Sequence, residues 1–520
     1  MTSPEPTAGP GPRTAPVALL PERARQSWLL SRAGRWPHAQ DHVLLSLVLL
    51  VSRSLLYLMG LRFKLVLDWM FLADPVELRE HLLQSLFYFH AYPPGMNLLT
   101  GILLKLSTSH IAELALCTFW IAGLVLFNSL LYLARAFALP RWVALALCIV
   151  FALIPPTLYL EQLYIYEYPA TALLCLAAAL FYRALRSPSS AAWGSFFLVF
   201  AFLACFRSTF HLFWFAALVM GSLLIVGAPA RRRVALGALA PAALLLGLYL
   251  KNYAVFGVFG GTSWGGANLV AVTTRHMSPE LRHSWVQEGK VSPFAEISVF
   301  AGPQAYAPYF VSAESGVWPP LPLLDAFQRP SLGADNFNHW WFLEINKQRR
   351  KDSLYALQTR PLDYLHTVFH RSLVELFSPT TEWHPDDGGP TSPHAGHRRV
   401  LGGYERVYNR LVHGTPSPYG LYIFLPLFGG WAVAQARSRF KANEPEACAQ
   451  AWLTCFCVLH VAYVLAVSCL FTAGECARYR YLIEPFIWVI VTKALVSLWG
   501  HAWRRAAGFP SGGIPAMFRA

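Results

Sequence analysis

Charged residues are scarce in this 520-residue chain. Asp, Glu, Lys and Arg together make up 13% of the sequence, whereas hydrophobic residues make up 55%, and the mean hydropathy is +0.40. Soluble domains carry about a quarter charged residues, so this composition excludes an ordinary soluble protein. Several nearly uncharged windows of about 20 residues are long enough to cross a bilayer as helices. The composition therefore predicts an all-α polytopic membrane protein.

Motifs with well-defined chemistry are also missing. The sequence contains no CxxC pair, no GxxxxGK[ST] loop and no HExxH motif, so it indicates neither a thiolate metal site, nor a P-loop, nor a zincin site. No basic stretch is interleaved with aromatic residues on a soluble module, which argues against nucleic acid as a partner. We predict no metal and no other cofactor, with a divalent metal as the alternative. Two groups of potential ligands keep that alternative open: His366, His370 and Glu375, and Asp386, Asp387, His394 and His397.

The basic residues orient the chain in the membrane. They cluster in the N-terminal tail and then near 135–141, 183–186, 231–233, 437–441 and 504–505. The positive-inside rule places such clusters in the cytoplasm. About ten spans then thread consistently with both termini cytoplasmic, and eleven spans are the alternative. The expected spans are 42–61, 111–133, 142–158, 168–185, 191–206, 209–228, 234–250, 418–435, 449–471 and 480–499.

This topology divides the chain into five parts. Residues 1–40, rich in Pro, Ala, Ser and Arg, are expected to be a disordered cytoplasmic tail. Residues 41–250 form an N-terminal membrane module with interfacial helices in its first loop. Residues 251–417 form one sizeable extracytoplasmic loop domain. Residues 418–505 form the C-terminal membrane helices, and 506–520 form a second cytoplasmic tail. We expect the chain to lie in a bacterial inner (plasma) membrane.

Ionisable residues near the predicted span ends gather on the extracytoplasmic side. Charges close to the hydrocarbon are expensive and usually have a partner or a task. So many at one face suggest a shared cavity. The polar residues concerned are Asp68, Asp74, Glu161, Glu167, Arg207, His211, Lys251, Asn252, Glu475, Arg478, Arg480 and Glu484.

The segment "SLFYFHAYPPGMNLL" (85–99) stands out in the first extracytoplasmic loop. Pro93 and Pro94 stiffen the chain there, and residues 96–106 are apolar but too short to span, so we expect a shallow or re-entrant helix. His90, Tyr92 and the neighbouring aromatic residues are expected to line a surface where a headgroup and a sugar meet. An ordinary aromatic belt at the membrane interface is the alternative.

Three features of the sequence resemble the GT-C superfamily of membrane glycosyltransferases, especially the branch of protein O-mannosyltransferases and the lipid A aminoarabinose transferase. An acidic residue follows the first span and precedes the "HAYPPGMNLL" motif, an acid opens the fourth span in "YEYPATALL", and a basic stretch, "RYRYLIEP", precedes the last span. The sequence departs from the family in having "DW" in place of an Asp-Glu pair, and in carrying Tyr92 before the prolines and Gly95 after them.

The resemblance implies a GT-C-like fold and transfer of a sugar from a polyprenyl-phosphate carrier, a co-substrate, to a glycan, lipid or protein acceptor outside the cytoplasm. Such a transfer needs a carboxylate to accept the acceptor's proton and cations to hold the departing phosphate. Asp68 is the candidate base, with Asp74 as the alternative, and Glu167 is a second carboxylate. The expected ligands of the donor or acceptor are His90, Tyr92, Arg207, Lys251, Arg478 and Arg480.

Each of these residues also has a structural interpretation. Asp68 or Asp74 can cap the following helix, Glu167 can pair with Arg207 inside the bundle, and the two C-terminal arginines can reach toward lipid headgroups. Two alternative functions also stay open. One is a transporter or flippase of a lipid-linked substrate, and the other is a glycan ligase or polymerase that uses a diphosphate-linked donor.

Overall fold

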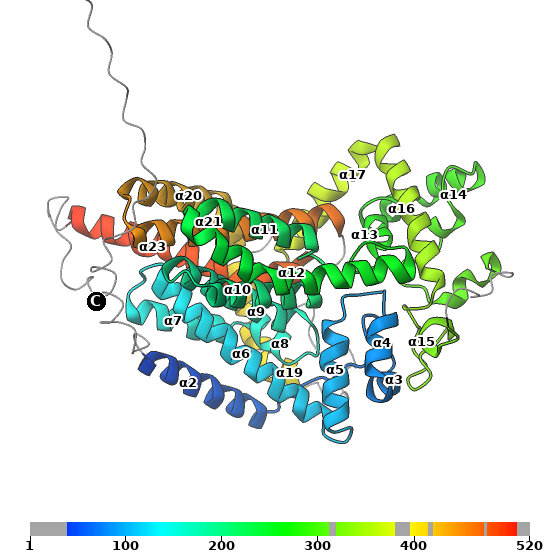
Figure 1. Ribbon diagram of the computed structural model, residues 1–520, viewed down its shortest axis with the longest axis horizontal. Helices are drawn as coiled ribbons and strands as arrows, with labels where there is room; N and C mark the ends of the chain where they lie inside the picture. The colour runs from blue at the N-terminus through cyan, green and yellow to red at the C-terminus, as the bar shows by residue number, and fades with distance from the viewer. Residues whose placement is uncertain (1–38, 311–318, 380–395, 414–419, 473–475, 507–520) are drawn as a thin grey trace, which may run out of the picture.

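A computed structural model describes residues 39–310, 319–379, 396–413, 420–472 and 476–506 (Figure 1). Within these residues all repetitive secondary structure is helical, and strand-like pairing is confined to two isolated bridges, Lys64–Leu163 and Gln328–Asp335. Six helices of the described chain are long and apolar enough to cross a membrane, or seven if one bent pair counts as a span. The predicted all-α polytopic architecture is confirmed, whereas the predicted number of spans is not established.

The long apolar helices run roughly side by side and form the body of the molecule (Figure 1). They are α2 (Ala39–Leu58), α6 (Ile111–Ala136), α9 (Glu167–Arg186), α12 (Ala228–Phe256), α21 (Pro445–Phe471) and the continuous run of α22 (Cys476–Arg480), η7 (Tyr481–Ile483) and α23 (Glu484–Ala506). The shorter helices of the body are α5 (Gly95–Leu106), α10 (Ser190–Phe206), α11 (Leu212–Ile225) and α20 (Leu425–Ala442), the last preceded by η6 (Gly420–Phe424).

Several expected spans differ from the helices observed. The expected span 142–158 is broken into α7 (Arg141–Leu153) and α8 (Pro155–Glu161), which meet at 60°. The break follows from Pro155 and Pro156, because a proline excludes its predecessor from the helical region, and Ile154 is indeed extended. Helix α11 has 14 residues and is therefore only about 21 Å long.

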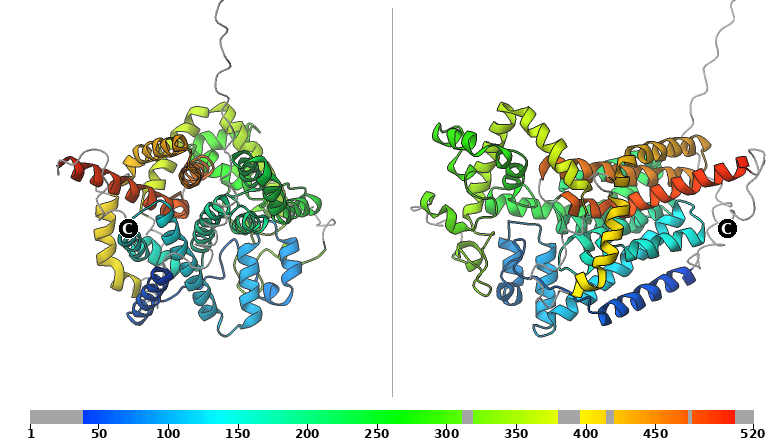
Figure 2. Two further views of the ribbon diagram at one scale, coloured as in Figure 1. Left: turned by 60° about the vertical axis from the view of Figure 1, so that its left-hand side comes forward. Right: turned by 180° about the vertical axis from the view of Figure 1, so that it is seen from behind.

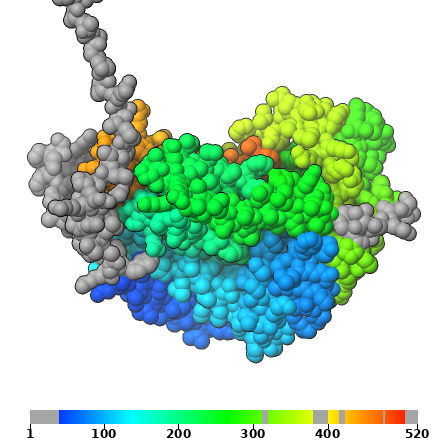
Figure 3. Space-filling view, in the orientation of Figure 1, coloured from blue at the N-terminus to red at the C-terminus, as the bar shows by residue number. Residues whose placement is uncertain are grey.

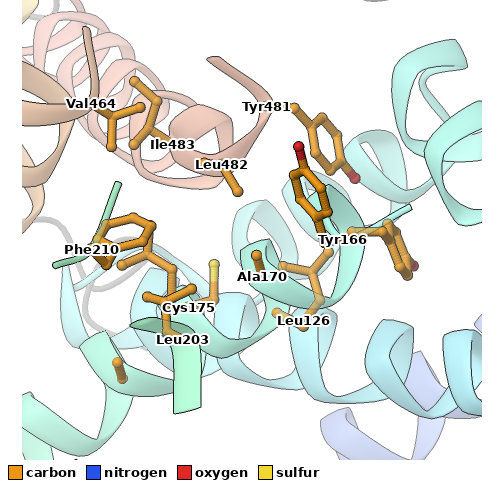
Figure 4. Close-up of a cluster of buried hydrophobic side chains, with 14 of the residues drawn as sticks. Leu126, Tyr166, Ala170, Cys175, Leu203, Phe210, Val464, Tyr481, Leu482 and Ile483 are labelled. Atoms are coloured by element: carbon orange, nitrogen blue, oxygen red, sulfur yellow. The ribbon is translucent and has the colours of Figure 1, made fainter. Parts of the chain in front are cut away.

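Helix α9 lies at the centre of the bundle and is buried along most of its length. Figure 4 shows Ala170 of α9, and Tyr166 just before this helix, beside side chains from α6, α10, α21 and η7. Small residues let the surrounding helices approach closely, as is common between membrane helices. A Cβ on Gly237 of α12 would lie 2.7 Å from the backbone nitrogen of Gly194 on α10, so that crossing requires glycine.

Short helices gather at one end of the body (Figure 1). Those from the first loop are α3 (Pro75–Glu80), α4 (Leu82–Tyr88) and α5. Those that follow α12 are α13 (Gly265–Val272), η1 (Thr274–His276), α14 (Pro279–Gln287), η2 (Pro293–Ala295), η3 (Pro303–Tyr309), α15 (Pro322–Asp325), α16 (Trp341–Thr359), α17 (Pro361–Thr367), η4 (Val368–Ser372) and α18 (Leu373–Phe377). The first loop and the later domain thus form one end of the molecule.

Helix α19 (Gly396–Val412) lies apart from the other helices of the loop domain (Figure 2). Its residue Leu401 packs on Leu158 and Tyr159 of α8, and the Tyr159 hydroxyl donates to Glu405 at 2.8 Å. At the opposite side of the molecule the surface is hollowed between α11–α12, in green, and α16–α17, in yellow-green (Figure 3). Orange side chains from the C-terminal part of the chain form the floor of this hollow.

Candidate active site

Three of the predicted site residues meet in the interior of the bundle, from positions far apart in the sequence. Glu167 is fully buried, and its Oε1 lies 3.0 Å from Nε of Arg478 and 3.8 Å from Nη2 of Arg207. Both arginines are also buried, at 4% and 7% exposure. The expected pairing of Glu167 with Arg207 is therefore present, but the shorter contact is to Arg478.

Two tyrosines enclose the Arg207 guanidinium. Its carbon lies 4.5 Å from the ring centre of Tyr166 and 3.9 Å from that of Tyr479, and such cation–π contacts fix a guanidinium in place. Arg478 approaches the same two rings and its Nη2 lies 3.4 Å from the Tyr166 hydroxyl. Both guanidinium groups thus contact the same two rings.

Arg207 differs from Arg478 in its hydrogen bonding. Within the part of the chain that the structure describes, its guanidinium donates no hydrogen bond, and its buried Nε lacks an acceptor. A buried charged donor without an acceptor is costly and calls for an explanation. An anionic ligand that accepts from Arg207 supplies one.

Two guanidinium groups lie beside one carboxylate at Glu167, in a buried place. Guanidinium groups stay protonated and match phosphate oxygens with paired N–H donors. Arg207 therefore offers the cluster a charged donor that suits a phosphate group.

Local structure explains how each side chain reaches the cluster. Glu167 is the first residue of α9, where the helix dipole favours a negative charge. Arg207 is the extended residue that ends α10. Arg478 belongs to the short α22, whose first backbone amide, from Cys476, donates to Glu375 Oε1 at 3.0 Å.

An aromatic chain connects this cluster with the first loop. The ring of Phe71 lies 4.8 Å from that of Tyr166 and 6.2 Å from that of Tyr92. Trp69 stacks on Phe71 at 5.7 Å, and Tyr92 stacks on Trp264 at 5.5 Å. The half-buried Trp69 and Tyr92 thus extend the cluster toward the surface with flat faces that suit the apolar side of a sugar ring.

The two candidate bases lie in different environments. Asp68 is exposed, and its side chain makes no hydrogen bond to the described residues. Since Asp68 precedes Phe71 by three residues, it lies within about 10 Å of the aromatic chain. Asp74 is buried and caps α3 by accepting from the Val76 amide at 2.9 Å, and it also accepts from the Ser331 amide at 2.8 Å and from its hydroxyl at 2.9 Å.

His90 and Lys251 both hold the loop before the proline pair. Nδ1 of His90 lies 2.9 Å from the Ser263 hydroxyl, and burial lowers the pKa of His90 to about 3, so its ring is neutral at physiological pH. The Lys251 ammonium, at the end of α12, donates to the carbonyl oxygens of Phe87 and Phe89 at 2.9 and 3.2 Å. These contacts fix the loop backbone; their predicted role in substrate binding stays a prediction.

Arg480 lies away from the cluster. Its Nε donates to Glu484 at 2.9 Å, its guanidinium lies over the Tyr422 ring at 4.5 Å, and it donates to the carbonyl oxygens of Leu376 and, at 2.9 Å, Ser378. The structure therefore brings Arg478, but not Arg480, beside Glu167. The buried pair of Arg53 and Glu161 is likewise separate and charge-balanced, with Nη2 and Oε2 2.5 Å apart.

The predicted metal ligands form no larger cluster in the described residues. His366 and His370 lie close, with ring centres 4.4 Å apart, but no group of three or more His, Cys, Asp or Glu side chains in the described chain is placed to hold a metal. Asp386, Asp387 and His394 lie outside the described residues, as does the side chain of His397.

Sequence analysis missed several residues at or beside this site, Trp69 and Phe71 among them. Tyr166 and Tyr479 contact the two arginines of the cluster. Tyr166 directly precedes Glu167 in the sequence, and Tyr479 lies between Arg478 and Arg480, so their positions could have identified them. Arg329 and Asn338, which bind the backbone of the first loop, lie in a segment without periodicity. No sequence signal pointed to them.

Comparisons with known proteins leave the family open. No family model and no curated protein matches the chain. Among solved structures, the chain is similar to the crystal structure of the oligosaccharyltransferase of Archaeoglobus fulgidus in the apo form, with a TM-score of 0.42 and 13% identity over 94% of this chain and 54% of that chain. The chain thus spans about half the length of that protein. Similarity at this level does not decide the function, which has to rest on the chemistry of the site.

Proposed function

We propose that this chain is an integral membrane glycosyltransferase of the GT-C type, which moves a sugar from a polyprenyl-phosphate donor to an acceptor outside the cytoplasm. The observation that carries the proposal is the buried Arg207 guanidinium, which contacts the rings of Tyr166 and Tyr479 and donates a hydrogen bond to no described residue. A lipid-linked phosphate in the membrane supplies the missing acceptor atoms.

Bond cleavage in the donor follows from this placement. The bond between the sugar's anomeric carbon and the phosphate oxygen breaks, and its electron pair stays on the phosphate. The polyprenyl phosphate gains one negative charge in that step. Arg207 and Arg478, preorganised by Tyr166 and Tyr479, stabilise the growing charge in a place that excludes water.

The acceptor side needs a base. Asp68 is exposed and lies on the loop whose residue Phe71 contacts Tyr166. We propose that its carboxylate takes the proton of the acceptor hydroxyl as that oxygen attacks the anomeric carbon. Asp74 is the weaker candidate because its carboxylate already accepts three hydrogen bonds, from Val76 and Ser331.

The remaining residues orient the reactants in this proposal. Glu167 keeps both arginines in place, and the half-buried Trp69 and Tyr92 offer aromatic faces to the sugar. His90 and Lys251 fix the loop that carries Tyr92. We place the site on the extracytoplasmic side and both termini in the cytoplasm of a bacterial inner membrane.

The proposed donor carries a single phosphate. A comparison with diphosphate-linked donors separates the proposed transferase from a ligase or polymerase.

The proposal is tested by the release of polyprenyl phosphate from radiolabelled lipid-linked monosaccharides. Purified protein is supplied with candidate glycan, lipid and protein acceptors, and the wild type is compared with Asp68→Asn. We expect release in the wild type and loss in the variant, with diphosphate-linked donors inactive. Loss in Asp74→Asn instead would move the base, and binding without turnover across the donor panel would favour a transporter or flippase.

A further inference from the structure

A short segment of the loop domain, Phe327–Asn338, reaches back to the first loop at three points. It belongs to the stretch between α15 and α16 and contains no long helix. Its contact residues are Arg329, Ser331 and Asn338, which bind positions about 250 residues earlier in the chain. We call this segment the clamp.

Arg329 holds the backbone around the candidate base. Its side chain is buried at 3% exposure. Nη1 lies 3.1 Å from the carbonyl oxygens of Leu67, Trp69 and Leu72, and Nη2 donates to the carbonyl of Asp68 at 2.5 Å. One guanidinium therefore gathers four carbonyl groups on both sides of Asp68 while leaving its carboxylate exposed.

Asn338 holds the other half of the loop in the same way. Its Oδ1 accepts from the amides of His90 and Ala91 at 2.8 and 3.0 Å, and its Nδ2 donates to the carbonyl of Tyr88 at 3.1 Å. Tyr92, the aromatic face proposed for the sugar, follows directly in the chain. The amide of Asn338 thus sets the path of the backbone that presents Tyr92.

Burying the Arg329 side chain in the clamp costs free energy. Burial lowers the pKa of Arg329, and the structure gives it no ion pair within 4 Å among the described residues. Arg329 binds carbonyl oxygens and interacts with the carboxylates of Asp68, Asp74 and Asp335 only beyond ion-pair distance. Its burial therefore carries a desolvation penalty that an apolar side chain would avoid. Fixing Asp68 and Tyr92 relative to the phosphate cluster accounts for that penalty, because small displacements of a reacting group reduce turnover strongly.

We infer that Arg329 and Asn338 are positioning residues that couple the loop domain to the transfer step, with Arg329 placing Asp68 and Asn338 placing Tyr92. The inference rests on the proposed function. It predicts that each residue acts on its own half of the loop and that neither contributes to phosphate binding. The phosphate cluster lies on α9, α10 and α22, which the clamp does not touch through any of these hydrogen bonds.

Hydrogen exchange of the full-length protein tests whether Arg329 and Asn338 hold the first loop, and it does not require a transfer assay. Arg329→Ala is expected to speed exchange in residues 67–73 about tenfold or more and to leave residues 88–91 unchanged, since about one lost bond to a charged group suffices for that factor. Asn338→Ala is expected to do the reverse. Arg329→Lys, which keeps the cation but loses the fork, replaces the alanine variant if that fails to fold. The matched control is Arg360→Ala, which removes an exposed arginine that forms an ion pair with Asp363.

Kinetics then separate positioning from general stability. In both variants kcat for transfer is expected to fall about 100-fold, while the affinity for farnesyl phosphate, the probe for the phosphate cluster, stays within about twofold. Equal exchange in variant and wild type, or a loss of farnesyl phosphate affinity that matches the loss of turnover, would overturn the inference. If the wild type transfers no sugar, the proposed function fails, yet the exchange pattern still decides whether the clamp exists.

Discussion

Replacing Arg207 by methionine should weaken phosphate binding while leaving the protein as stable as before. The Arg207 guanidinium donates no hydrogen bond to the described residues, and its ion pair with Glu167 is 3.8 Å long. Glu167 retains Arg478 at 3.0 Å when Arg207 is removed. The substitution replaces a buried charged side chain by an apolar one of roughly similar size. The free energy of unfolding should therefore change by less than about 1 kcal/mol or rise.

The effect on ligand binding should be large. A hydrogen bond to a charged group contributes about 1.5–3 kcal/mol. Loss of one such bond from Arg207 to the phosphate weakens binding by about 10- to 150-fold. Affinity for farnesyl phosphate in detergent measures this effect, and thermal unfolding of the same samples measures stability.

A matched buried arginine provides the control. Arg53 makes hydrogen bonds of 3.0 and 2.9 Å from Nε to the carboxylate of Glu161. Arg53→Met leaves that carboxylate buried and unpaired, which should lower the free energy of unfolding by about 3–5 kcal/mol and leave farnesyl phosphate affinity unchanged. If Arg207→Met binds like the wild type, or is destabilised as much as Arg53→Met, the reasoning that Arg207 binds the phosphate is refuted.

Three further predictions concern the other candidate residues. Asp68→Asn should lower the rate of sugar transfer by about 100- to 10,000-fold and leave farnesyl phosphate binding intact. Asp74→Asn should lower the free energy of unfolding by about 1–2 kcal/mol and retain transfer. Equal losses of transfer in the two variants would contradict this assignment. Arg480→Met should destabilise the protein in thermal unfolding by about 3–5 kcal/mol by leaving Glu484 unpaired, without weakening phosphate binding; a binding defect would return Arg480 to the site. The pKa of His90 is about 3 in the folded protein and ordinarily 6.5, so the unfolded chain binds the proton first as pH falls. Stability should then drop below pH 6.5 by up to about 1.4 kcal/mol per pH unit, and unfolding curves of His90→Gln should be flatter over that range; parallel curves would contradict the assignment.

The sequence pointed to a set of polar residues that includes the cluster, but not to which of them meet or which way each one points. Glu167, Arg207 and Arg478 were singled out because charges near hydrocarbon are expensive, and they do meet in the structure. Arg480 was grouped with Arg478 although the two lie two residues apart in a helix. Each helical residue turns by about 100°, so these side chains point to nearly opposite faces. Only the helical assignment of 476–480 makes that visible.

The long-range polar contacts made by loop residues leave no recognisable pattern in the amino-acid sequence. Arg329 and Asn338 bind backbone atoms about 250 residues away, and backbone acceptors carry no sequence signal. His90 looked like a surface residue because it stands in an aromatic segment, yet the fold buries it against Ser263. Loop geometry of this kind depends on the whole fold and not on local periodicity.

The number of spans was the weakest part of the predicted fold. Hydropathy located apolar segments well, but 142–158 contains a Pro-Pro pair that bends the chain by 60°. The apolar helices α10 and α11 have 17 and 14 residues, shorter than the length that alone identifies a span. Helix ends depend on capping and on neighbours, which composition does not encode.

The most direct test of the central claim is a structure of the full chain with farnesyl phosphate bound. We predict the phosphate beside Arg207 and Arg478, with an oxygen within about 3 Å of Nε of Arg207 and the lipid tail leading out between helices of the membrane body. A phosphate bound elsewhere, with the Arg207 guanidinium unchanged and without an acceptor, would contradict the account.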